Sequence, residues 1–208
     1  MPQSSFDILK QTCHDACRER HACTSGYRQM LASENVSQMM ATWRANWEDI
    51  VTSKYADIIR TELPKQYPAL RTEMNAAGIY FNECPLNAPI YVRVLIASPT
   101  SPVHIYGDAR AYILSPVPSS EVVPRSQSVC ASTTVIAHDH AQVYHYPSSA
   151  APCALPPVSV TLLDHAYAHL LPTDLVTLSR FATVTTTPVT PVPDGSPSGN
   201  PSSFIPNP

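Results

Sequence analysis

Histidine is the residue type whose number and spacing most suggest chemistry in this chain. Six of the eight histidines lie at or after position 104, at positions 104, 138, 140, 145, 165 and 169. Neutral imidazole nitrogens bind zinc, and a nearby carboxylate can complete or orient such a site. Two segments offer both groups, so the candidate metal ligands are His138, Asp139, His140, Asp164 and His165.

These residues become neighbours only if the two segments stack in register. Asp139 would then lie over Asp164 and His140 over His165, on adjacent strands ~4.8 Å apart. Two imidazoles at that spacing could share a zinc ion. The alternative is that they are polar corner residues with no chemical role.

Cysteines near the N-terminus form a second candidate cluster. Cys13, Cys17 and His21 are spaced four residues apart and Cys23 follows, so on a helix the first three share a face. Small thiols buried against a neighbouring helix explain the same spacing without a metal. Cys84, directly before Pro85, is predicted to be an exposed thiol.

Common catalytic and nucleotide-binding motifs are missing. The chain contains no Gly-x-Gly-x-x-Gly, Walker, His-Glu-x-x-His or Gly-x-Ser-x-Gly sequence. Because the chain contains only five glycines, a glycine-rich phosphate-binding loop is not expected. The carboxylates Glu48 and Asp49 are expected on a solvated helix face, and no catalytic residue or resident cofactor is assigned.

A degenerate repeat must position the histidines. Four nine-residue segments align without gaps, starting at Val103, Val135, Val160 and Val176. The first position is always Val and the seventh is always Ala, at 109, 141, 166 and 182. Apolar residues at alternate positions predict strands. Gly or Asp at position five of the first three segments predicts a bend, so each unit is interpreted as strand, corner, strand.

Units with one apolar face must bury it by stacking, which is the logic of a β-solenoid. The unit starts lie 32, 25 and 16 residues apart. The last interval predicts a bare unit, and the proline-rich stretches 115–134 and 147–158 predict outward loops. The alternative is an antiparallel β sandwich with those stretches as connections.

Residues 1–78 are predicted to be helical. Ser4 or Ser5 can cap a first helix, and an apolar stripe from Val36 to Leu63 predicts one long helix or two that break at Thr52-Ser53. Pro64 is expected to end it. A further helix from Pro68 would close at Gly78 in the left-handed conformation. Residues 79–81 and 90–96 are expected as strands.

The fold class is therefore α+β. The predicted segments are a helical domain at 1–78, connecting strands at 79–102, a β-repeat domain at 103–186, and a disordered proline-rich tail at 187–208. The formal net charge of −3 gives no broad basic face for nucleic acid. No apolar run is long enough to cross a membrane, and no secretory signal is visible, so a cytoplasmic location is expected.

The units resemble the short Val-x-h-x-(Asp/Gly)-(Asn/His)-Ala-x-Val repeats of uncharacterised β-solenoid proteins from gut bacteria and their mobile elements. The segment 76–85, followed by residues 102–107, resembles the junction before the repeats in those proteins. The resemblance covers roughly residues 25–186 and implies a solenoid without any transferable activity.

Three functions remain open from the sequence. The first is a non-enzymatic structural or protein-interaction module that self-associates or binds a protein partner. The second is a metal-dependent enzyme that uses the His/Asp positions. The third is an inhibitor or immunity-type binding protein from a mobile element.

Overall fold

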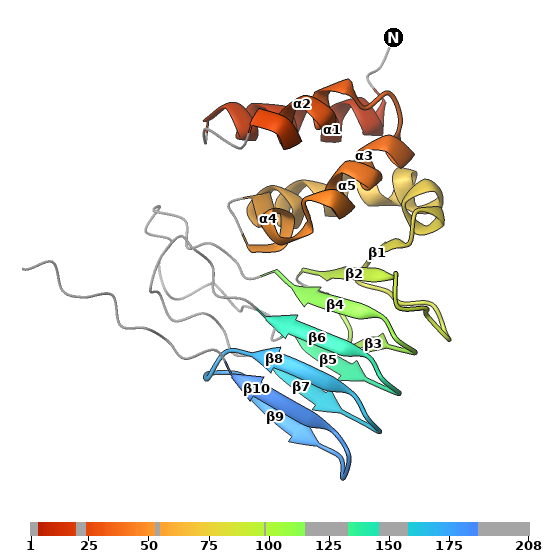
Figure 1. The fold of residues 1–208 in the computed structure, drawn as a ribbon, viewed down its shortest axis with the longest axis vertical. Coiled ribbons are helices and arrows are strands. Elements are labelled where there is room, and N and C mark those ends of the chain that lie inside the picture. The colour runs from red at the N-terminus through yellow and green to blue at the C-terminus, as the bar shows by residue number, and fades with distance from the viewer. Residues whose placement is uncertain are drawn as a thin grey trace, which may run out of the picture.

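The computed structural model describes residues 4–19, 24–52, 55–97, 99–114, 133–145 and 158–186. Helices occupy the N-terminal part and parallel strands the C-terminal part, so the protein is α+β as predicted. The helices lie at one end of a stack of strands (Figure 1). The tail predicted at 187–208 lies outside the described residues.

Within the described residues, the N-terminal part contains five helices: α1 (Ser5–Glu19), α2 (Thr24–Ala32), α3 (Val36–Ala45), α4 (Trp47–Thr52) and α5 (Tyr55–Ala76). Ser4 caps α1, because its Oγ accepts a hydrogen bond from the Asp7 backbone N–H at 3.1 Å. Asn46 separates α3 from α4, so the apolar stripe does not form one long helix. The break expected at Thr52-Ser53 falls on residues outside the described ranges.

The prediction that Pro64 ends a helix is wrong, as is a separate helix start at Pro68. Both prolines lie inside α5. Each removes one backbone N–H and crowds the preceding turn, but the buried face continues across them, with Leu63, Tyr67 and Leu70 all covered. Packing therefore outweighs the local cost. Gly78, at φ +73°, closes the helix as expected.

The apolar stripe predicted for this region forms the helical core. Met39, Met40 and Trp43 of α3 are at most 1 % exposed, and they lie in one cluster with Ile59 and Leu63 of α5. The cluster also includes side chains of the first strands, so helices and sheet share one core.

The described residues form ten strands in two sheets. A six-stranded sheet has the order β1 (Ile79–Phe81), β2 (Arg93–Ile96), β4 (Arg110–Ile113), β6 (Gln142–His145), β8 (Tyr167–Leu170), β10 (Thr183–Thr186). A four-stranded sheet has the order β3 (Val103–Ile105), β5 (Thr134–Ala137), β7 (Ser159–Leu162), β9 (Leu175–Leu178). From β3 onward the chain alternates between the two sheets.

All the strand pairs are parallel, so the antiparallel alternative is wrong. The physical reason is the alternation itself. After each strand the chain turns a corner into the other sheet, and it returns to the first sheet running in its original direction.

The alignment of the Val–Ala repeat is confirmed as the pairing register. Val135 pairs with Val103 and with Val160, and Val160 pairs with Val176. The last interval contains no inserted loop, because links of only four residues join β7 to β8, β8 to β9 and β9 to β10. The proline-rich stretches fall almost entirely outside the described residues.

The sheet begins before the first recognised unit. β2 pairs in register with β4, so that Val94 lies opposite Ala111. Residues 79–81 and 93–96, expected as connecting strands, are the first two strands of the larger sheet.

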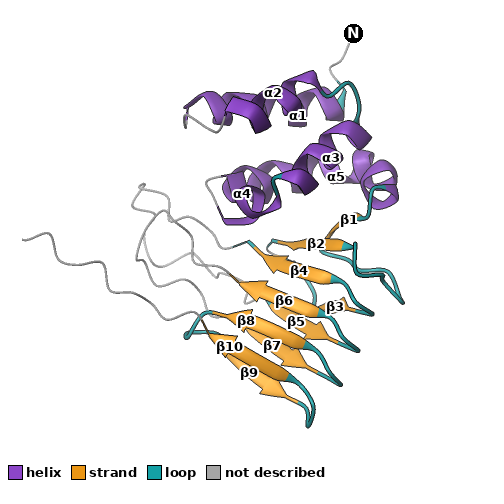
Figure 2. Cartoon of the chain, viewed as in Figure 1, coloured by secondary structure: helices purple, strands orange, loops and turns teal. Residues whose placement is uncertain are grey.

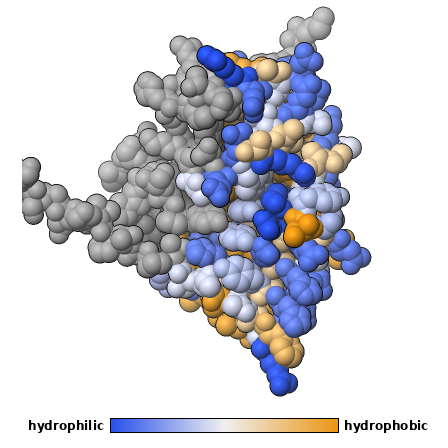
Figure 3. Space-filling model, in the orientation of Figure 1, coloured by the Kyte–Doolittle hydropathy of each residue, from blue (hydrophilic) through white to orange (hydrophobic). Residues whose placement is uncertain are grey.

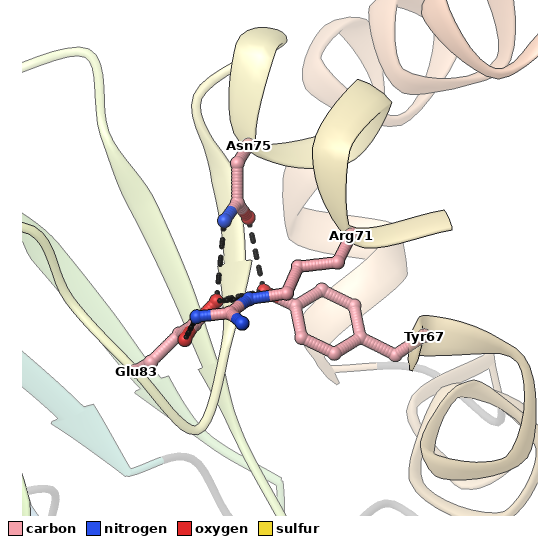
Figure 4. Close-up of polar contacts among 4 residues, drawn as sticks. All are labelled: Tyr67, Arg71, Asn75 and Glu83. Atoms are coloured by element: carbon pink, nitrogen blue, oxygen red, sulfur yellow. Dashed lines mark hydrogen bonds and ion pairs between the residues drawn. The ribbon is translucent and has the colours of Figure 1, made fainter. Parts of the chain in front are cut away.

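A polar cluster joins α5 to the segment after β1 (Figure 4). The Glu83 carboxylate accepts hydrogen bonds from Arg71 Nε at 2.8 Å and from Asn75 Nδ2 at 3.1 Å, and the Tyr67 hydroxyl lies 2.5 Å from its Oε1. Burial alone would raise the pKa of Glu83, but the hydrogen bonds from Arg71, Tyr67 and Asn75 outweigh it and hold the pKa below its ordinary value. Glu83 is therefore an ionised structural anchor.

Of the helices the structure describes, none combines the length and apolarity that a membrane crossing requires.

Candidate functional site

The predicted site residues lie on corners that stack along one side of the sheets (Figure 2). Position five of the first three units has a left-handed backbone: φ is +64° at Gly107, +56° at Asp139 and +53° at Asp164. This confirms the bend predicted from Gly and Asp. Only glycine fits at position 107, because the Cβ atom of any other residue would lie 2.4 Å from the Ala88 carbonyl oxygen.

The two aspartates bind backbone rather than each other. Asp139 Oδ2 accepts a hydrogen bond from the Gly107 N–H at 2.9 Å, and Asp164 Oδ2 accepts one from the Asp139 N–H at 3.2 Å. Each carboxylate thus satisfies the corner of the preceding unit. Asp at this position both tolerates the left-handed conformation and holds the neighbouring corner.

The histidines form two separate stacks. His140 lies over His165 as predicted, with ring centroids 5.4 Å apart and planes 13° from parallel, and Phe181 continues that stack. His138 instead stacks on Tyr106 at 4.7 Å, and its Nε2 lies 3.1 Å from Nδ1 of His104. The structure therefore pairs His138 with a histidine that the sequence did not single out.

Within the described ranges, no three His, Cys, Asp or Glu side chains form a group that could hold a metal ion. Zinc binding by His138, Asp139, His140, Asp164 and His165 stays a prediction. It is tested by titrating metal-free protein with zinc, where a rise in thermal stability that a chelator reverses would support it and no binding would end it.

The cysteines give one correction. Cys84 was expected to be exposed, but it is partly buried, and burial raises the pKa of its thiol to about 11. A thiol with that pKa is mostly protonated at neutral pH and is a poor nucleophile. Cys13 is buried in the helical core, while the Cys17 side chain, His21 and Cys23 lie outside the described residues.

The fourth unit shows what the repeat exposes. At the first repeat position Val103, Val135 and Val160 are 0–3 % exposed, whereas Val176 is 37 % exposed. At the third position the first three units are fully buried, whereas Leu178 is 48 % exposed. These side chains occupy interior positions of the stack, and they are exposed because no further unit among the described residues covers them.

The strand edges at this end are also unpaired. β9 pairs only with β7, and β10 pairs only with β8, among the strands described. Proteins commonly protect such edges with Lys, Pro or a bulge, yet the β9 and β10 sequences Leu-Val-Thr-Leu and Thr-Val-Thr-Thr contain neither residue and no charge. Apolar surface is visible over this end of the molecule in Figure 3. We call β9 and β10 with their corner, residues 175–186, the last unit.

The signal for this surface was present in the sequence as the end of the repeat, although the degree of exposure was not. Comparisons of the chain with protein families, with characterised proteins and with solved structures give no match. The function is therefore argued from the geometry of the chain itself.

Proposed function

We propose that the protein is a non-enzymatic interaction module in which the β units form a short solenoid, and that the last unit binds a second copy of the chain. The observation that carries the proposal is the exposure of Val176 and Leu178 at positions that are buried in every earlier unit.

Three features support the solenoid. The pairs are all parallel, the chain alternates between two sheets, and the same repeat position lies in register from unit to unit. The interior between the sheets is filled by small and branched side chains such as Ala141, Val143 and Leu162, each 0 % exposed.

A second copy of the chain suits the open end, because an identical surface supplies both an apolar face and an unpaired strand edge. The apolar side chains need apolar cover, and the unpaired N–H and C=O groups need a strand edge. Charge does not oppose the contact, since neither strand carries any. The opposite end of the stack is occupied by the helices (Figure 1), so the end-to-end contact closes after two chains.

A two-fold axis normal to the sheets would set β10 antiparallel to its copy and β9 antiparallel to its copy. Both sheets would continue through the contact, and an interface of this kind uses the same patch on each chain.

The test is the oligomeric state of the full chain by light scattering across a concentration series. The wild type is expected to be a dimer, and V176K/L178K is expected to be a folded monomer. The matched control is L86K/I90K, which changes two exposed apolar residues of the segment before β2, 71 % and 58 % exposed, and is expected to leave the dimer intact.

A monomeric wild type at all concentrations would overturn the proposal. Equal loss of the dimer in both double variants would also overturn it, because the contact would then not be specific to the last unit.

A further inference from the structure

A second feature lies at the other end of the stack, where the helices meet the outer face of the larger sheet. A hollow of about 530 Å³ opens there between α3–α4 and strands β2, β4 and β6. Pockets for small molecules typically have ~300–1,000 Å³, so the hollow is large enough for one. Its principal lining residues are Arg44, Trp47, Arg93, Arg110, Tyr112 and Tyr144.

The hollow concentrates positive charge in a chain whose net charge is −3. Among the described residues, three arginines and one carboxylate, Glu48, line it, and together they carry a formal charge of +2. Arg93 and Arg110 are direct partners across the parallel β2–β4 pair. Like charges at adjacent positions of a ladder are destabilising, so folding alone does not explain their placement.

No carboxylate of the described residues forms an ion pair with these arginines. Arg93 Nη1 donates to the Ile90 and Val92 carbonyls at 2.7 and 3.2 Å, and Arg44 Nη2 donates to the Ala77 carbonyl. Arg110 Nε is buried and has no hydrogen bond partner among the residues that the structure describes. No ion pair within the described part of the chain joins Glu48 to any of the three arginines.

The electrostatic environment of Arg93 reflects this crowding. Burial lowers its pKa below the ordinary value, and the Arg110 and Arg44 charges lower it further. An anion in the hollow would neutralise this repulsion.

Aromatic side chains form the rest of the wall. Tyr112 and Tyr144 are stacked, with centroids 5.2 Å apart and planes 14° from parallel, and Trp47 meets Tyr112 edge-on at 5.3 Å. Burial raises the pKa of both tyrosines, so their hydroxyls stay protonated at neutral pH. The wall therefore offers hydroxyl groups and flat rings beside the guanidinium groups.

From these contacts we propose that the hollow binds a small organic monophosphate that carries an aromatic ring. The phosphate accepts hydrogen bonds from Arg93 and Arg110, and the ring lies against the Tyr112–Tyr144 pair. A phosphate monoester carries about −1.5 to −2 charges at neutral pH, which matches the +2 of the hollow better than a single carboxylate does. Flat rings stack favourably on aromatic side chains.

The test is calorimetric titration of the full chain with three probes: adenosine monophosphate, adenosine and inorganic phosphate. The nucleotide is expected to bind most tightly, inorganic phosphate more weakly, and adenosine weakest. R110Q is expected to weaken nucleotide binding about tenfold or more, because a charge-assisted hydrogen bond is lost.

The matched control is R28Q, which removes an exposed arginine of α2 outside the hollow and is expected to bind like the wild type. A circular dichroism melt of each variant checks that the fold is kept. The proposal is overturned if the nucleotide does not bind, if R28Q weakens it as much as R110Q does, or if adenosine and the nucleotide bind equally. Ligand binding by the hollow does not depend on the oligomeric state, so failure of this proposal can be distinguished from failure of the proposed self-association.

Discussion

The two ends of the β stack use the same strand pattern but have opposite surroundings. At the helical end, Ile79 and Leu95 are fully buried, because α5 and the other helices cover them. At the open end, Leu175 and Leu178 are 62 % and 48 % exposed. The comparison shows that a repeat fixes which side chains point inward, while only the next layer of structure decides whether they are buried.

The polar anchors of the two ends also differ. Glu83 at the helical end is partly exposed and bound by three side chains. Asp174, in the link before the last unit, has a fully buried side chain, and its Oδ2 lies 2.7 Å from His145 Nδ1. The Asp174 carboxylate also accepts the N–H groups of Val158 and Leu171, at 3.2 and 3.0 Å. The open end therefore depends on one buried carboxylate.

The largest expected effect is from removing that carboxylate. D174A should lower the free energy of unfolding by about 3–5 kcal/mol, since breaking a buried pair leaves unsatisfied polar groups. Urea denaturation measures it, and hydrogen exchange should show the greatest loss of protection at residues 175–186. D108A removes an exposed carboxylate of the first corner and should change the stability little; equal losses in both variants would contradict the anchoring role.

The next prediction compares alanine substitutions at the same repeat position in two units. Leu162 is 0 % exposed and Leu178 is 48 % exposed, and they are register partners. L162A should cost about 2–5 kcal/mol because it leaves a cavity, whereas L178A should cost less than about 1 kcal/mol in the monomer. Denaturation at low protein concentration checks this. Similar costs would mean that the last unit is covered in solution.

A corner substitution should have a smaller effect. D139A removes the acceptor for the Gly107 N–H and places alanine at φ +56°, so a loss of about 1–2 kcal/mol is expected. D139N keeps an oxygen acceptor and tolerates the left-handed conformation, so it should stay close to wild type in thermal melts. If D139N were as unstable as D139A, the negative charge rather than the corner geometry would be the important property.

An effect of similar size is expected at the helical end, and it depends on pH. E83Q should lower the free energy of unfolding by about 1–2 kcal/mol at neutral pH, because hydrogen bonds to a charged group are lost. The pKa of Glu83 is lowered in the folded state. Its stabilisation is therefore present above the unfolded pKa of about 4.3 and disappears as the pH falls through the lower folded pKa.

Denaturation of wild type and E83Q across this pH range checks the sign. The two stability curves should converge on acidification, and E73Q, which changes an exposed glutamate of α5, should follow the wild type throughout. Curves that diverge on acidification would contradict an ionised anchor.

The sequence by itself determined the α+β class, the left-handed corners and the register of the Val–Ala repeat. These features follow from local rules, because alternation, Gly or Asp at a bend and a repeated spacing act over a few residues. The same local rules failed at Pro64 and Pro68, where the packing of α5 outweighed the cost of proline.

Only the tertiary structure decided which chemical groups meet. His138 lies beside His104 because the register joins residues 34 positions apart. For the same reason the Asp139 carboxylate accepts a hydrogen bond from the Gly107 backbone N–H. Arg93 and Arg110 become neighbours only through the β2–β4 pair, and Arg44 joins them because α3 packs above that sheet. Long-range register and helix packing bring these groups together, and no short-range pattern in the sequence encodes either one.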